Sequence, residues 1–185
     1  MRHTIQFVFA AAALTIALLG AELAAAEVLS TTANGFEVRE TAHSAASPDK
    51  VYAALLLPAR WWSSDHTFSG SAANLVLDAR AGGCWCETLP DGGSVEHMRV
   101  LYVSPGKILR LRGAIGPFQA LAVDGVMTFT VKGSAEGTDI SLSYAVGGFA
   151  KDGFDTLAKA ADHVLGEQLQ RLMKLADGEP APRAH

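Results

Sequence analysis

The sequence predicts an α+β fold, in which a curved antiparallel sheet of about seven strands packs against one long C-terminal helix. Two observations lead to this prediction. Short segments of alternating apolar and polar residues follow one another from residue 75 to residue 146, separated by turns rich in glycine and proline. A single amphipathic stretch with helical spacing comes last. Consecutive strands joined by tight turns form antiparallel sheets, and one helix can cover one face of such a sheet.

The first 26 residues have the pattern of a secretory signal peptide. Arg2 and His3 give a positive start, an apolar stretch follows to Leu19, and Ala24–Ala26 supply the small residues of a cleavage site. The apolar stretch is shorter than the roughly 20 residues that a membrane-spanning helix needs. We therefore predict cleavage after Ala26, a periplasmic or secreted protein, and no membrane span in the mature chain.

Composition narrows the class of partner. The chain carries 15 basic and 19 acidic residues, which gives a net charge of −4, and its basic residues form no run. This balance does not favour a nucleic-acid partner. Two cysteines are too few for a disulfide scaffold. We expect one domain over residues 27–177, followed by a disordered tail over residues 178–185.

The domain is predicted to begin with a strand at residue 36, and a helix interrupts the strand pattern soon afterwards. Pro48 suits the first position of that helix. Pro58 should end it, so Trp61 and Trp62 are expected near a loop.

Six further strands are expected, at residues 75–80, 83–89, 94–103, 108–113, 124–132 and 138–146. Turn residues separate them, among them Pro90-Asp91-Gly92 and Pro105-Gly106. The final helix follows, and its apolar stripe is predicted to contain Leu157, Ala161, Val164, Leu165, Gln168, Leu172 and Leu175.

The turn at Pro90-Asp91-Gly92 decides which way the neighbouring side chains point. A three-residue loop pairs Leu89 with Gly93 and Cys86 with Glu96. Strict alternation then turns His97 toward water. The apolar face would comprise Cys84, Cys86, Met98, Val100, Tyr102, Leu109 and Leu111. A two-residue loop at Asp91-Gly92 remains the alternative, and it would place Cys86 opposite His97.

The Cys84-Trp85-Cys86 segment allows three interpretations. A metal site lacks a further ligand at a recognisable zinc spacing, and we expect neither a metal nor a cofactor. A disulfide fits a regular strand poorly, because residues two apart lie about 6.6 Å apart along it. We favour two buried thiols that behave as small apolar side chains, with the disulfide left open.

The chain resembles a known superfamily in its element order and in four segments. These are "RWWSSDHTFSG", "GGCWCETL", "GGSVEHMRVLYVSPGKILRLRGAIGPFQ" and "SYAVGGF" with "VLGEQLQRLMK". Over residues 34–177 it is similar to the START-like, or polyketide cyclase (SRPBCC), superfamily, near the branch of the chaperone-ATPase activators. The resemblance implies a helix-grip fold with a ligand cavity between the sheet and the last helix. An exported protein would not meet a cytosolic chaperone, so activation of that ATPase is not expected.

The resemblance makes the derived apolar face the expected wall of that cavity. Gln168 is an amide on an apolar stripe, and Phe118 is the apolar tip of a glycine-rich segment that could act as a lid. The candidate ligand-binding residues are Trp61, Trp62, Cys84, Cys86, Met98, Tyr102, Phe118, Tyr144 and Gln168. For each, a purely structural role is the alternative.

The predicted function is the binding of a small apolar or amphipathic molecule by an exported protein. Two alternatives remain open. One is a cyclase- or lyase-type enzyme that uses the same cavity, with His97, Glu87 or Gln168 in the reaction. The other is a protein-interaction module that uses an outer face of arginine, histidine and tryptophan. No catalytic motif in the sequence decides whether the protein is an enzyme.

Overall fold

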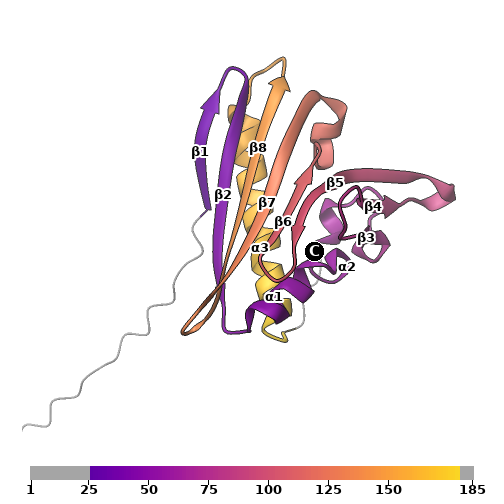
Figure 1. Ribbon diagram of the computed structural model, residues 1–185. Coiled ribbons are helices and arrows are strands. Elements are labelled where there is room, and N and C mark those ends of the chain that lie inside the picture. The colour runs from indigo at the N-terminus through magenta and orange to yellow at the C-terminus, as the bar shows by residue number, and fades with distance from the viewer. Residues whose placement is uncertain (1–25, 180–185) are drawn as a thin grey trace, which may run out of the picture.

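The computed structural model describes residues 26–179 (Figure 1). Apart from Ala26, the predicted signal peptide lies outside the described residues, and so do residues 180–185 of the predicted tail. The strands are β1 (Ala26–Thr32), β2 (Gly35–Ser44), β3 (Leu75–Leu77), β4 (Cys84–Thr88), β5 (Ser94–Ser104), β6 (Ile108–Arg112), β7 (Ala122–Ser134) and β8 (Gly137–Phe149). The α-helices are α1 (Pro48–Leu55), α2 (Pro58–Trp61) and α3 (Asp155–Ala176).

These elements form the predicted α+β, helix-grip arrangement. All neighbouring strands are antiparallel, and the order across the sheet is β1-β2-β8-β7-β6-β5-β4-β3. Figure 1 shows α3 lying along one face of the curved sheet, with α1 and α2 near one end of it. The fold prediction is confirmed.

The sheet has eight strands in the described residues, where about seven were expected. The additional strand is β1, which forms one edge of the sheet and pairs only with β2. Its register shifts between Val28 and Ser30, so its apolar residues do not alternate regularly. This irregularity hides the strand from a search for period-two patterns.

Strands β2, β8 and β7 form a regular part of the sheet. No register shift occurs between β2 and β8, or between β7 and β8. The predicted alternation holds here: Phe129 of β7 and Leu142 of β8 pair with one another, and both are buried in the core. Burying side chains of this size stabilises the fold by about 1.5–3 kcal/mol each.

The C-terminal helix packs with a wider face than the sequence suggested. Ala161, Leu165, Gln168 and Leu172 are buried as predicted, but Leu157 and Val164 are only half-buried. The helix also buries Ala158, Leu169, Arg171 and Met173.

The β4–β5 hairpin begins in the predicted register and then leaves it. Leu89 donates its backbone N–H to the carbonyl of Gly93, and Cys86 pairs with Glu96. The register then shifts, so that Trp85 pairs with Met98 rather than with His97. Residue 97 is the extra residue of a β-bulge, and both His97 and Met98 are buried. The prediction that His97 points to water is therefore wrong.

A second register shift lies in the β5–β6 hairpin, between Val100 and Tyr102. Val100 pairs with Leu111 as predicted, but Tyr102 pairs with Arg110 and is 47% exposed. Its ring lies against the guanidinium of Arg110, 5.9 Å from ring centroid to Cζ. The assignment of Tyr102 to the apolar face is wrong, because the extra residue in β5 reverses the direction of the side chains that follow.

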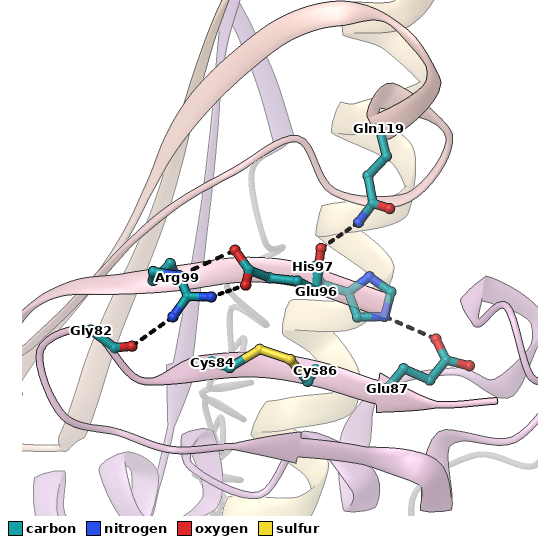
Figure 2. Close-up of a disulfide and its surroundings, with 8 residues drawn as sticks. All are labelled: Gly82, Cys84, Cys86, Glu87, Glu96, His97, Arg99 and Gln119. Carbon is teal, nitrogen blue, oxygen red and sulfur yellow. Dashed lines mark hydrogen bonds and ion pairs between the residues drawn. A yellow bond between two sulfur atoms is a disulfide. The ribbon is translucent and has the colours of Figure 1, made fainter. Parts of the chain in front are cut away.

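The two cysteines also lie on the outer face. In the structure Cys84 and Cys86 form a disulfide, with their Cα atoms 5.4 Å apart (Figure 2). Both residues are half-buried, whereas Trp85 between them is buried. The favoured interpretation of two buried thiols is therefore wrong. The bulge is the reason. It pairs Trp85 with the buried Met98, so Trp85 and Glu87 point inward. The cysteines on either side of Trp85 therefore point to the outer face.

Candidate functional site

A partly open cavity of about 380 Å³ lies between α3 and the loops opposite it. Helix α3 contributes one wall with small and aliphatic side chains. The lining residues are Trp62, Asp65, His66, Thr67, Phe68, His97, Ile115, Gly116, Pro117, Phe118, Leu157, Ala160, Ala161, Val164 and Leu165. Most of this wall is apolar, which is typical of a site for a small apolar molecule.

His97 is the buried polar residue among those that line the cavity. Its Nε2 atom lies 2.9 Å from Oε2 of Glu87, and the two side chains point toward one another from β5 and β4 (Figure 2). The His97 residue is 5% exposed and Glu87 is 1% exposed. Glu87 sits on the same face of β4 as Trp85, two residues before it, and so points inward.

Backbone groups hold Glu87 in its ionised form. Burial would raise the pKa of this carboxyl, but the hydrogen bonds that it accepts from Ser69, Phe68 and His97 outweigh burial and lower the pKa below its ordinary value. The backbone N–H groups of Phe68 and Ser69, which donate to the Glu87 carboxylate, also hold the loop after α2 against β4.

Burial lowers the pKa of His97 below its ordinary value, and the neighbouring Glu87 offsets only part of this effect. Burial therefore favours the neutral form of the imidazole. Because an ionised carboxylate can only accept hydrogen bonds, the single imidazole proton resides on Nε2. The Nδ1 atom then carries a free lone pair. A neutral imidazole held in this way by a carboxylate can accept a hydrogen bond or a proton.

The loops around the cavity are fixed by further buried hydrogen bonds. Oε1 of Gln168 accepts the backbone N–H of Ser63 at 2.7 Å, and the indole of Trp62 donates to the carbonyl of His66. These bonds attach the segment that follows α2 to α3 and to itself. The loop side of the cavity is thus built on defined contacts.

Tyr144 fixes the glycine-rich segment on the other side of the cavity. Its hydroxyl donates to the carbonyl of Gly113 and accepts the backbone N–H of Ile115. Its ring passes over Gly125, where a Cβ atom would lie 2.6 Å from Cε2 of the ring. Phe118 packs against Tyr144 with 6.4 Å between ring centroids and is buried.

The structure places the nine predicted site residues in three groups. Trp62 and Phe118 line the cavity. Four residues are buried in the surrounding core and do not line it: Trp61, Met98, Tyr144 and Gln168. Three lie on the outer side of the sheet: Cys84, Cys86 and Tyr102.

His97 and Glu87 were considered only for the enzyme alternative, and not as ligand-binding residues. The bulge that turns His97 inward leaves no mark in the alternation of the sequence. Glu87 did carry a signal, because it shares its strand face with Trp85. An inward tryptophan at position 85 would have implied an inward carboxylate at position 87.

Residues 26–179 contain neither a candidate metal site nor a candidate membrane-spanning helix. Within this range no cluster of three or more His, Cys, Asp or Glu side chains could hold a metal ion. Over the same residues no helix combines the length and the apolar character needed to cross a membrane.

Comparison with known families agrees with this architecture. The sequence profile described as "Polyketide cyclase / dehydrase and lipid transport" matches residues 35–177. The chain belongs to this family. The match runs from β2 to the end of α3, and the family description covers both ligand-binding and cyclase-type roles. A search of curated proteins gave no match.

Solved structures with a similar fold cover most of the chain. Protein MLL2253 of Mesorhizobium loti is similar over 77% of this chain and 97% of its own, with 20% identity and a TM-score of 0.57. Protein CV1439 of Chromobacterium violaceum matches over 76% and 96%, with 22% identity and a TM-score of 0.55. CalU16 of Micromonospora echinospora matches over 87% and 88%, with 14% identity and a TM-score of 0.54. At these identities the likeness shows the fold alone.

Proposed function

We propose that this member of the family binds a small apolar or amphipathic molecule in the cavity between α3 and the loops at residues 62–68 and 115–118. The observation that carries the proposal is the cavity itself. It has about 380 Å³ of space, an apolar wall from α3, and one buried polar group that could orient a ligand. The family description, which includes lipid transport, agrees with this role.

Filling the cavity tests the proposal. In a Val164→Trp variant the indole would project from the half-buried wall of α3 into the space a ligand needs. Lys159→Trp, on the exposed side of the same helix, is the matched control. Native mass spectrometry and organic extraction should find a small molecule with the wild-type protein and with the Lys159 variant, and none with the Val164 variant. Equal retention by all three proteins would count against the cavity.

We further propose that the protein is exported. The pattern of residues 1–26 supports this, and so does the Cys84–Cys86 disulfide, since disulfides persist in oxidising compartments. Cleavage after Ala26 would leave all of β1 except its first residue. N-terminal sequencing of the protein from its own cells should begin at Glu27. A chain that retains residues 1–26 would contradict export with cleavage.

Catalysis of a proton transfer is the second candidate function, and the buried His97–Glu87 pair favours it. A neutral imidazole beside an apolar cavity can remove a proton from a bound substrate, and the carboxylate stabilises the imidazolium that forms. Phenylacetone, a small aromatic ketone, serves as a probe. Nuclear magnetic resonance in D₂O should show exchange of its α-hydrogens with wild-type protein and loss of that exchange with His97→Gln. Exchange at the rate of the buffer alone would argue against this activity.

A further inference from the structure

The cavity wall contains a histidine with an unpaired, buried acceptor atom. Nδ1 of His97 is buried and has no hydrogen-bond partner among the described residues, although the imidazole forms part of the cavity wall. A buried acceptor without a partner destabilises the folded protein, because the atom has lost its hydrogen bond to water. Such an atom beside a cavity is a place where a ligand can supply the missing donor.

The hydrogen bond on the other ring nitrogen determines what Nδ1 can recognise. Because Nε2 donates to the carboxylate of Glu87, Nδ1 can accept but cannot donate. A carbonyl or an ether oxygen therefore gains nothing at this position, whereas a hydroxyl does. Phe68 packs on the imidazole with 5.8 Å between ring centroids and is 54% exposed, so its ring can move aside for a ligand.

The other residues of the cavity wall favour a ligand with an aromatic ring system. Trp62 and Phe68 line the cavity from the loop after α2, and Phe118 lines it from the segment at residues 115–118. Aromatic rings pack well against one another in edge-to-face and offset geometries. Helix α3 contributes only apolar side chains opposite them. The other polar lining residues, Asp65, His66 and Thr67, follow one another on a single loop.

We propose that the cavity takes a phenolic ligand, whose hydroxyl donates a hydrogen bond to Nδ1 of His97. The inference rests on the proposed binding function and names the class of ligand. Glu87 is a positioning residue, because it fixes the tautomer that leaves Nδ1 free. If the hydroxyl loses its proton, the proton moves from the phenol oxygen to Nδ1. The products are a phenolate and an imidazolium that remains hydrogen-bonded to Glu87.

A matched pair of probes tests the inference. 2-Naphthol and 2-methoxynaphthalene share the same aromatic body, but only the naphthol has a donor. Fluorescence titration should show that the wild-type protein prefers 2-naphthol by about tenfold, which corresponds to about 1.4 kcal/mol and is typical of a hydrogen bond made to a buried, otherwise unpaired acceptor. No preference in the wild-type protein would overturn the inference. Failure to bind either probe would overturn the binding function as well.

The variant His97→Gln separates recognition from support of the loop. A glutamine amide can still donate to Glu87 where Nε2 does, but it has no acceptor at the position of Nδ1. This variant should lose the preference for 2-naphthol over 2-methoxynaphthalene. A preference that survives in His97→Gln and disappears in Asp65→Asn would overturn the assignment to His97.

The pH dependence provides a readout that needs no variant. Protonation of His97 would place a hydrogen on Nδ1 and remove the acceptor. The preference for 2-naphthol should therefore be constant between about pH 6.5 and 8.5, below the range in which a phenol ionises, and fall in acid, because burial lowers the pKa of His97 below its ordinary value. The titratable groups that face this side of the cavity are Glu87, Asp65 and His66. His66→Gln should leave the profile unchanged, and a profile that follows His66 instead would contradict the inference.

Discussion

Two parts of the sheet differ in the regularity of strand pairing: a regular half formed by β2, β8 and β7, and an irregular half formed by β4, β5 and β6. Strands β2, β8 and β7 pair without a register shift, whereas β5 carries one shift against β4 and another against β6. The regular half supplies core beneath α3. The irregular half turns His97 toward the cavity and Tyr102 away from it. Extra residues in a strand can re-aim a side chain while most of the ladder is kept, and here that side chain belongs to the candidate site.

The largest expected effect lies in the regular half. Phe129→Ala should lower the free energy of unfolding by about 3–5 kcal/mol, because Phe129 is buried in the core between the sheet and α3. Chemical denaturation would measure it. Binding of 2-naphthol by the molecules that remain folded should be unchanged, because Phe129 does not line the cavity. If Phe129→Ala weakened 2-naphthol binding and left the free energy of unfolding unchanged, the regular half would not be purely structural.

Glu40 gives the second largest effect, and its environment contrasts with that of Glu87. Burial, together with the neighbouring carboxyl of Asp162, raises the pKa of Glu40 to about 8. A raised carboxyl pKa means that the native state holds the proton more tightly than the unfolded state. This contribution to stability is present below pH 4.5 and is lost as the pH rises toward 8.

Glu40→Gln should therefore stabilise the protein relative to wild type by on the order of 2–4 kcal/mol above pH 8, and by much less below pH 4.5. Thermal unfolding across this pH range would measure the difference. Glu37→Gln, on the opposite face of β2, is the control and should show no such trend. A difference between wild type and the Glu40 variant that does not vary with pH would show that Glu40 is ionised in the folded protein.

Tyr144 links the two halves, and its hydroxyl should have an intermediate effect. Tyr144→Phe leaves the carbonyl of Gly113 and the N–H of Ile115 without their shared partner. We expect a loss of about 1–2 kcal/mol in unfolding free energy and faster hydrogen exchange at Ile115. Unchanged exchange at this amide would mean that the hydroxyl does not fix the segment that carries Phe118.

The smallest effect is expected at Tyr102, on the outer side of the irregular half. Tyr102→Ala should change stability by less than about 1 kcal/mol and leave 2-naphthol binding unchanged, because the side chain is half exposed and contacts Arg110. Had the residue faced the cavity as the sequence suggested, the same variant would weaken binding. A clear loss of affinity would thus contradict the register of β5.

The sequence predicted the fold class and most of the element order because alternation and turn residues act locally. The alternation predicted over residues 124–132 and 138–146 holds, since a ladder without shifts preserves parity along its whole length. The same reasoning misplaced His97 and Tyr102, because one extra residue in β5 reverses parity and no local pattern announces it. Trp62 and Phe118 line the cavity as predicted. Both were assigned from large apolar side chains in loop segments, and that assignment does not depend on the register of any strand.

The central claim is that His97 carries an unpartnered Nδ1 acceptor beside the cavity, held in that tautomer by Glu87. Long-range ¹H–¹⁵N nuclear magnetic resonance on imidazole-labelled protein at pH 7 tests it most directly. We expect a neutral ring protonated on Nε2, with an Nδ1 resonance that shifts when 2-naphthol is added and does not respond to 2-methoxynaphthalene. A ring protonated on Nδ1, or an Nδ1 resonance that saturating 2-naphthol leaves unchanged, would contradict the account.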